Sequence, residues 1–272
     1  PRTSSAASDV YKRQVMGSTE NVELVGIADP LGDPTGTINS ELIFSSLEEL
    51  IDQDIDLAVV ACPTIEHEQV AMKLCEAGIH TLVEKPLAID TEAALRIANA
   101  FQKANLVGAV GHIERFNPAI RSMRQRIAEG ELGELYQIST RRIGPFPNRI
   151  RDVGVVKDLA THDLDLTVWV GNSQFKQISA HTAHKAGRSH EDLVAITGIL
   201  ESDVVTNHLV NWLSPLKERF TIATGEKGSF IADTLLADLT LHRNADAPPP
   251  WEGISQFTGV ADCLLYTSPS PR

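Results

Sequence analysis

A carboxylate and an imidazole four residues apart form the first pair in the sequence that could do chemistry. Asp158 and His162 lie in the segment DLATHDLD, which has a helical pattern. Residues four apart share one helix face, so Asp158 could fix the tautomer of an imidazole that accepts a proton near neutral pH. Asp163 points elsewhere, and Asp165 is a competing partner for His162. The alternative is an ordinary surface pair with the same spacing.

A lysine at the end of an apolar run is the second candidate. The tripeptide Glu84-Lys85-Pro86 closes the predicted strand 80–84. The carboxyl ends of parallel strands border the crevice where such sheets bind ligands. There the ammonium of Lys85 could stabilise the alkoxide that forms when a hydroxyl loses its proton. The tripeptide alone is equally compatible with a solvated turn.

An aspartate closes the segment VELVGIAD at residue 29. In a dinucleotide-binding unit, an acidic residue after the second strand accepts hydrogen bonds from the adenosine ribose and repels a 2′-phosphate. Asp29 therefore indicates NAD rather than NADP. The alternative is an aspartate that starts a turn before Pro30. The assignment also requires a preceding strand and a glycine-rich loop about 20 to 30 residues upstream, and this loop is missing from the sequence.

Hydrophobic periodicity predicts the elements that would position these side chains. Short apolar runs rich in β-branched residues occur four times, at 22–28, 57–62, 80–84 and 106–110. Segments with helical spacing, 66–77 and 91–104, lie between them, and Gly78 stands where a helix cap is expected. This alternation is typical of a parallel sheet covered by helices. We predict an α/β domain of the doubly wound Rossmann type over 15–118, without its first strand and glycine-rich loop.

The pattern of predicted helices and strands changes after residue 118. Helices are predicted over 119–128 and 155–170. Strands are predicted over 136–142, 177–182, 193–200, 204–213, 219–224, 229–233 and 239–242. Strands that follow one another through short turns form antiparallel sheets. We predict a second, α+β domain over 119–262 with an open, mainly antiparallel sheet.

Both ends of the chain read as translated adaptor DNA. Residues 9–14, DVYKRQ, can be encoded by GAT GTG TAT AAG AGA CAG, and the reverse complement of that string, shifted by one frame, encodes CLLYTS, residues 263–268. One DNA element read on opposite strands explains both ends and resembles the adaptors of sequencing libraries. We expect residues 1–14 and 263–272 to be artefactual, and 15–262 to be an internal part of a longer protein. The alternative is two unrelated tails.

Composition excludes several classes of protein. The chain has 272 residues, of which 42% are hydrophobic, and this is enough to bury a core. No apolar run approaches the ~20 residues of a membrane span. The net charge of −12 argues against a nucleic-acid or anionic-membrane partner, since both require surplus Lys and Arg. Three cysteines do not make a disulfide framework, so a cytoplasmic location is expected.

Seven motifs, in their order along the chain, resemble the glucose-fructose oxidoreductase and inositol dehydrogenase family, also called Gfo/Idh/MocA. They are IADP (27–30), ACPTIEH (61–67), VEKPLA (83–88), GHIERFNP (111–118), GELYQI (133–138), GVVKDLATHDLD (154–165) and TGEKGSF (224–230). No single motif is specific to this family, but the seven together, in this order, are. Within the family, segments 111–118, 142–165 and 211–228 are similar to those of dehydrogenases of nucleotide-activated amino sugars.

The resemblance implies a role for each candidate. Lys85 would polarise the reacting hydroxyl beside the nicotinamide, Asp158 would bind substrate or orient the imidazole, and His162 would accept the proton as hydride leaves for NAD. The peptide bond before Pro86 would be cis. The residues expected to contact the cofactor are Asp29, Pro63, Thr64, His67, Glu84 and Lys85.

Arginines stand out against the acidic background at five positions: Arg115, Arg141, Arg142, Arg149 and Arg151. Guanidinium groups bind phosphate through paired hydrogen bonds, so this set could hold the diphosphate of a nucleotide sugar. The predicted substrate contacts are Arg115, Asn117, Arg149 and Arg151. The alternative is an arginine-rich surface or a dimer contact.

The expected reaction is oxidation of a secondary hydroxyl of a sugar, in particular a nucleotide-activated amino sugar, to a ketone with NAD. No metal site is expected, because His181 and His184 have no cysteine or carboxylate at ligand spacing. A homodimer or homotetramer is expected through the open sheet. Three alternatives stay open: an inositol or free-aldose dehydrogenase of the same family, a non-catalytic cofactor-binding regulator, and a chain made inactive by unpaired sheet edges.

Overall fold

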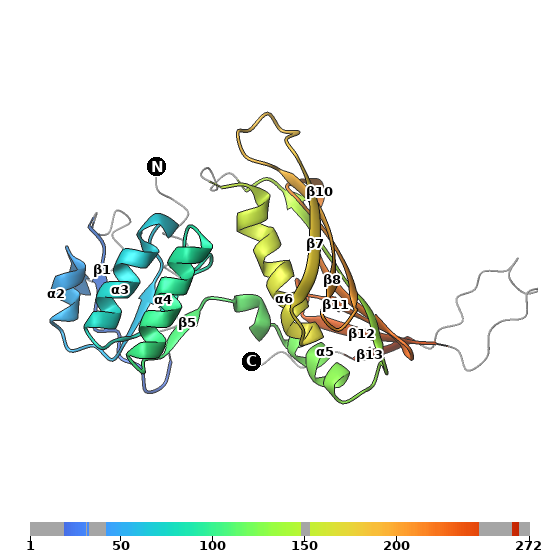
Figure 1. The fold of residues 1–272 in the computed structure, drawn as a ribbon, viewed down its shortest axis with the longest axis horizontal. Helices are drawn as coiled ribbons and strands as arrows, with labels where there is room; N and C mark the ends of the chain where they lie inside the picture. Colours follow the sequence, from blue (N-terminus) through green and yellow to red (C-terminus); the bar gives the residue numbers. More distant parts are fainter. Residues whose placement is uncertain (1–18, 31, 33–41, 148–152, 245–262, 267–272) are drawn as a thin grey trace, which may run out of the picture. The chain divides into compact units, whose positions relative to one another are not determined.

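The structure is a computed structural model and describes residues 19–30, 32, 42–147, 153–244 and 263–266 (Figure 1). They form two compact units that divide between Gly111 and His112. The division lies before the predicted boundary at 118, because the intervening residues contact the second unit. Arg115 forms an ion pair with Asp165, and Asn117 caps a helix there.

The first unit is built on a three-stranded parallel sheet in the order β3-β4-β5. Its main elements are β3 (Leu57–Val60), α3 (His67–Glu76), β4 (His80–Val83), α4 (Thr91–Lys103) and β5 (Gly108–Val110). Asp90 caps α4 by accepting a hydrogen bond from the Ala93 N–H at 2.8 Å. Gly78, with a φ of +79°, turns the chain at the end of α3. The predicted alternation of strands and helices is confirmed here.

A separate two-stranded parallel sheet pairs β1 (Ile27–Ala28) with β2 (Ile43–Phe44). The strand predicted over 22–28 is therefore too long, because only two of its residues have ladder partners among the described residues. The sequence analysis also misses β2 and the short helix α2 (Leu47–Ile51). The ring of Phe44 lies over Gly26, where an added Cβ would be 2.3 Å from it.

The second unit is an eight-stranded sheet with α5 (Pro118–Ala128) and α6 (Thr161–Gly171) against one face (Figure 1). The strand order is β13-β12-β11-β10-β6-β9-β8-β7. The strands are β6 (Leu135–Pro145), β7 (Phe175–Ala183), β8 (Leu193–Leu200), β9 (Val205–Asn211), β10 (Leu213–Gly225), β11 (Gly228–Asp233), β12 (Asp238–Arg243) and β13 (Cys263–Tyr266). The β6–β9 pair is parallel and the other pairs are antiparallel. The predicted open, mainly antiparallel sheet is confirmed.

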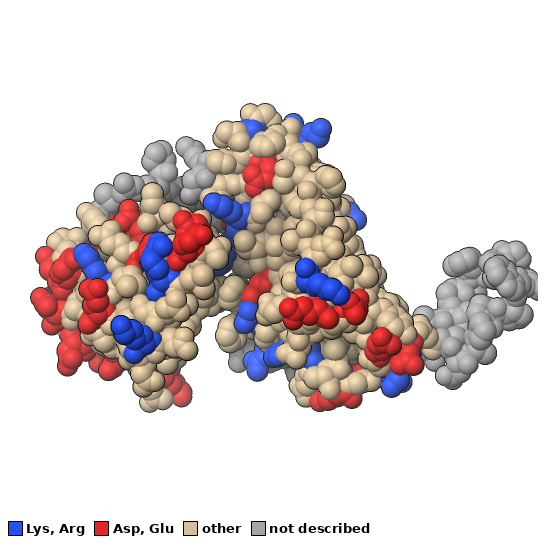
Figure 2. Space-filling view, in the orientation of Figure 1, with Lys and Arg blue, Asp and Glu red and all other residues tan. Residues whose placement is uncertain are grey.

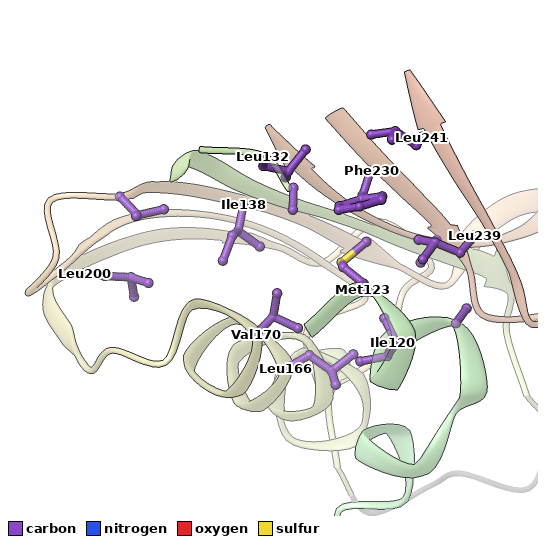
Figure 3. Close-up of a cluster of buried hydrophobic side chains, with 14 residues drawn as sticks. Ile120, Met123, Leu132, Ile138, Leu166, Val170, Leu200, Phe230, Leu239 and Leu241 are labelled. Carbon is purple, nitrogen blue, oxygen red and sulfur yellow. The ribbon is translucent and has the colours of Figure 1, made fainter. Parts of the chain in front are cut away.

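The core of the second unit lies between its helices and the sheet (Figure 3). Ile120 and Met123 of α5 and Leu166 of α6 point toward Ile138 and Phe230 of the sheet, and all five side chains are fully buried. Along β8, buried and exposed residues alternate. The face of the sheet away from the helices is therefore open at β8.

β13 lies within the segment that we expect to be artefactual. It pairs with β12 from Leu239 opposite Tyr266 to His242 opposite Cys263. An edge strand is added by backbone hydrogen bonds, which any extended segment can form. The adaptor origin of these residues therefore stays a prediction. The other residues to which it applies, 1–14 and 267–272, lie outside the described part of the chain.

Acidic side chains gather on the surface of the first unit (Figure 2). Five exposed ones lie in α2 and just after it: Glu48, Glu49, Asp52, Asp54 and Asp56. They account for part of the net charge of −12. Within the described ranges, no helix is both long enough and apolar enough to cross a membrane.

Candidate functional site

The carboxyl edge of the first unit's sheet carries the predicted lysine. β3 and β4 end in register at Val60 and Val83. The ladder extends one residue further: the Glu84 N–H donates to the Val60 carbonyl at 2.9 Å, and the Gly111 N–H donates to the Val83 carbonyl at 2.8 Å. Lys85 follows at once and is half-buried. It therefore begins the loop at the edge where open α/β sheets bind ligands.

His67 lies against the same loop. The Lys85–Pro86 peptide bond is cis, as the resemblance implies. The Pro86 carbonyl oxygen is 2.9 Å from Nδ1 of His67, and the Cys62 carbonyl oxygen is 3.0 Å from Nε2. The side chain of His67 is 1% exposed. The ring thus contacts both loops at the sheet edge and has little exposed surface, and its place beside the cofactor stays a prediction.

Glu84 packs on the neighbouring strand. An added Cβ at Gly111 would lie 2.7 Å from Oε1 of Glu84, so a larger residue there would displace the carboxylate from the end of β5. Glu84 is half-buried. Its contact with the cofactor stays a prediction.

The remaining cofactor candidates lie at turns. The Pro63 carbonyl accepts a hydrogen bond from the Glu66 N–H at 2.8 Å, beside the 3-10 turn η2 (Thr64–Glu66). Asp29 follows β1, and its carbonyl accepts from the Gly32 N–H at 2.9 Å. Asp29 thus both follows a strand and starts a turn, and its side chain is half-buried. Among the described residues, no three His, Cys, Asp or Glu side chains could hold a metal ion.

Asp158 and His162 lie where a π-helix passes into an α-helix. The segment η4 (Val156–Ala160) has π geometry, and α6 begins at Thr161. A single α-helix over 155–170 was the expectation, so its first turn is corrected. π turns are rare and occur frequently at functional sites. Asp158 and His162 are both half-buried.

Glu191 anchors the start of this helix. Its carbonyl accepts from the Val155 N–H at 3.0 Å, and its carboxylate accepts from the Val156 N–H at 3.1 Å. A carboxylate at a helix N-terminus satisfies an otherwise unpaired N–H and complements the helix dipole. Gly154 leaves space for the Glu191 side chain, since an added Cβ at residue 154 would lie 2.0 Å from its carboxylate. The sequence analysis misses Glu191, because no local pattern reveals a contact across 35 residues.

A buried ionic network begins at the residue after His162. Asp163 is 2% exposed, and both its oxygens accept from Nε of Arg142, at 3.1 and 3.0 Å. Nη1 of Arg142 donates to Glu114 at 2.9 Å, and Nη1 of Arg219 lies 3.5 Å from the same Glu114 oxygen. Burial raises the pKa of Asp163 to about 6, although Arg142 opposes the rise.

The second unit should therefore become less stable as the pH rises through about 6. An acid whose pKa is higher in the folded chain contributes stability that is fully present below its unfolded pKa, here 3.8, and is lost as the pH rises through the folded pKa. A rise from 3.8 to about 6 corresponds to about 3 kcal/mol. Between pH ~4 and ~7, urea unfolding should show a steeper loss of stability for the wild type than for Asp163→Asn. Parallel curves for the two proteins would contradict the assignment.

Arg142 is not available to a phosphate, which corrects its place among the candidate arginines. It is 3% exposed and lies between two carboxylates. Its neighbour Arg141 points to the other face of β6 and forms a partly exposed ion pair with Glu218 at 2.7 Å. Adjacent strand residues point to opposite faces, so two arginines that are adjacent in sequence take part in separate contacts.

Two residues that are predicted to contact the substrate form hydrogen bonds within the second unit. Arg115 donates two hydrogen bonds to Asp165, which also lies 3.3 Å from His112. Asn117 accepts from the Ala119 N–H at 3.0 Å as the cap of α5. Binding of substrate by these side chains stays a prediction. Two further candidates, Arg149 and Arg151, lie outside the described residues.

Two family models match the two units. Residues 4–112 match the model described as an oxidoreductase family with an NAD-binding Rossmann fold, and residues 120–231 match the GFO/IDH/MocA C-terminal domain. The chain belongs to the Gfo/Idh/MocA family. The family resemblance and the predicted cofactor class, NAD, are thereby confirmed.

Members of this family with assigned names are similar to the chain over part of their length. UDP-N-acetylglucosamine 3-dehydrogenase of Acidithiobacillus ferrooxidans is 36% identical over 149 residues, which are 54% of this chain and 46% of the relative. The scyllo-inositol 2-dehydrogenase (NAD(+)) of Bacillus subtilis is 27% identical over 180 residues, 63% of this chain and 53% of the relative. The chain thus spans about half the length of the curated relatives it matches.

Solved structures of the Gfo/Idh/MocA fold superpose on most of the chain. UDP-N-acetylglucosamine 3-dehydrogenase GnnA of A. ferrooxidans matches with a TM-score of 0.72 at 26% identity, over 83% of this chain and 68% of that one. The WlbA dehydrogenase of Chromobacterium violaceum, solved with NADH and UDP-GlcNAcA, matches with a TM-score of 0.77 at 22% identity, over 92% and 78%. The second match shows the fold alone.

Proposed function

We propose that the protein is an NAD-dependent dehydrogenase that oxidises a secondary hydroxyl of a nucleotide-activated amino sugar to a ketone. The main support is the position of Lys85, which begins a loop at the carboxyl edge of the parallel sheet in a chain of this oxidoreductase family. The amino-sugar substrate is supported by the relative named UDP-N-acetylglucosamine 3-dehydrogenase, at 36% identity.

The described residues fit NAD at the carboxyl edge of the first unit. Asp29 follows a parallel strand, where a carboxylate suits ribose hydroxyls. The loops after β3 and β4 lie side by side, tied by His67. The proposed residues at the cofactor are Asp29, Pro63, Thr64, His67, Glu84 and Lys85. When bound, NAD supplies the hydride acceptor.

Side chains of the protein would accept the proton of the sugar hydroxyl and stabilise the negative charge that forms on its oxygen. The ammonium of Lys85 would stabilise the alkoxide as the sugar hydroxyl loses its proton. His162 would accept that proton, and Asp158 would orient the imidazole or bind the sugar. The presence of all three residues supports a catalytic role rather than a purely regulatory one. The proposed substrate contacts are Arg115, Asn117, Arg149 and Arg151.

UDP should inhibit the protein expressed from its full reading frame. A guanidinium set that holds a diphosphate binds UDP but not uridine, so UDP is expected to compete with the sugar nucleotide and not with NAD. The measurement is the initial rate of NADH formation from UDP-N-acetylglucosamine, with uridine as the control. Oxidation of myo-inositol without any effect of UDP would instead support the alternative, an inositol dehydrogenase, which the inositol dehydrogenase relatives favour.

We further propose a homodimer or homotetramer in the cytoplasm. The face of the sheet opposite the helices exposes apolar side chains, among them Ile199 (37%) and Val205 (49%), which are cross-strand partners on β8 and β9. Among the described residues, Cys62 and Cys75 form no disulfide, which is consistent with a reducing compartment. Light scattering of the purified protein would test the oligomeric state, and a monomer at micromolar concentration would contradict it.

A further inference from the structure

We infer that His67 is a positioning residue that fixes the segment carrying Lys85 by tying it to the neighbouring loop. The inference deepens the proposed function, because it rests on the role of Lys85 given there. His67 itself is 1% exposed and offers little surface for a direct contact. Its effect would act through the backbone that follows β4.

The imidazole spans two loops that leave adjacent parallel strands. Val60 of β3 and Val83 of β4 are in register, and the chain then runs to Cys62 in one loop and to Pro86 in the other. His67 is the first residue of α3, so its backbone is held by the helix. The ring reaches the Pro86 carbonyl with Nδ1 at 2.9 Å and the Cys62 carbonyl with Nε2 at 3.0 Å.

Both partners of the ring are backbone carbonyls, and a carbonyl oxygen only accepts hydrogen bonds. Each contact is a hydrogen bond when the ring nitrogen that makes it carries a hydrogen, and which nitrogen donates depends on the tautomer. A buried carbonyl left without a donor costs free energy, so the two loops favour the arrangement in which His67 lies between them. A phenylalanine or leucine side chain of similar size offers no such link.

The carbonyl of Pro86 belongs to the residue directly after Lys85. Peptide groups are planar and rigid, so a hydrogen bond to this carbonyl limits rotation of the backbone next to Lys85. On the other side, the Glu84 N–H is held by the Val60 carbonyl at 2.9 Å. Lys85 thus lies between two fixed backbone groups. A displacement of about 1 Å at a reacting group can lower a rate by about 100-fold.

Three variants separate the two hydrogen bonds in the protein expressed from its full reading frame. His67→Leu removes both. His67→Asn places an amide N–H near the position of Nδ1 and keeps the bond to Pro86, whereas His67→Gln places it near Nε2 and keeps the bond to Cys62. His80→Leu is the matched control, since this histidine is exposed at the opposite end of β4, where Nδ1 accepts from the Val107 N–H at 3.0 Å.

We expect His67→Leu to lower kcat by about 10- to 100-fold, with the KM for the sugar and the Kd for NAD within about threefold of wild type. His67→Asn should retain more turnover than His67→Gln, because it keeps the bond beside Lys85. His80→Leu should stay within about twofold. Equal losses of kcat in the Asn and Gln variants would overturn the inference. This comparison tests the inference even if the leucine variant does not fold.

A second readout does not depend on turnover. Acetic anhydride acetylates lysine amines. The rate for Lys85, divided by the rates for Lys73 and Lys103, reports the environment of the Lys85 amine. His67→Leu should change this ratio, and His80→Leu should not. If Lys85→Ala keeps wild-type turnover, the proposed function fails, while the labelling ratio still tests the tie between His67 and Lys85. Wild-type kcat or a wild-type ratio in folded His67→Leu would overturn the positioning role.

Discussion

Replacing Lys85 with alanine is expected to lower kcat by about 100- to 1,000-fold while the Kd for NAD changes by less than about threefold. Removal of one preorganised group that stabilises a developing negative charge typically costs this much. The effect should be large because Lys85 is half-buried at the carboxyl edge of the sheet, with fixed backbone on both sides. Steady-state rates and NAD titration by fluorescence would measure the two quantities.

Lys85→Arg and Lys103→Ala are suitable controls for this experiment. Arginine keeps the positive charge but not the shape of the ammonium, so it should restore only part of the rate. Lys103 is exposed at the end of α4, and its loss should leave kcat unchanged. A folded Lys85→Ala protein with wild-type turnover would remove Lys85 from the mechanism.

Replacing Arg142 with methionine is expected to lower the free energy of unfolding of the second unit by about 3–5 kcal/mol. Methionine fills most of the space of the arginine stem but leaves the buried carboxylate of Asp163 without its guanidinium partner and removes one of two from the partly buried Glu114. Burial already disfavours the ionised form of Asp163, as its raised pKa shows. Urea unfolding at pH about 7.5, followed by tryptophan fluorescence, would measure the loss.

Arg141→Met is the matched control, since it changes the adjacent residue on the other face of β6. Arg141 is 52% exposed, and its ion pair with Glu218 is at the surface. Surface ion pairs contribute about 0–1 kcal/mol, so this variant should lose little stability. Equal losses in the two variants would contradict a special role for the buried network.

The positions of most elements follow from the sequence because they depend on local periodicity. β8 is predicted with its observed bounds, and α4 and α5 to within one residue. Their patterns of buried and exposed side chains repeat every two or about 3.6 residues. β1 is the counterexample: its apolar run is long, but its ladder is two residues, because strand length depends on a partner from elsewhere in the chain.

The candidate catalytic residues were likewise visible in the sequence, since Lys85 ends an apolar run and Asp158 and His162 have a regular spacing. The contacts that surround them were not. His67 meets Pro86 across 19 residues, Arg142 meets Asp163 across 21, and Glu191 meets Val156 across 35.

The sequence by itself determined the two-unit order of elements, the family and the residue types available for chemistry. Only the tertiary structure decided that His67 is a buried tie, that Arg142 is a buried counterion and that Asp158 lies in a π turn. The physical reason is that such contacts depend on which strands are neighbours, in which register, and which face each side chain takes. These choices minimise the free energy of the whole fold, and a local stretch of sequence does not contain them.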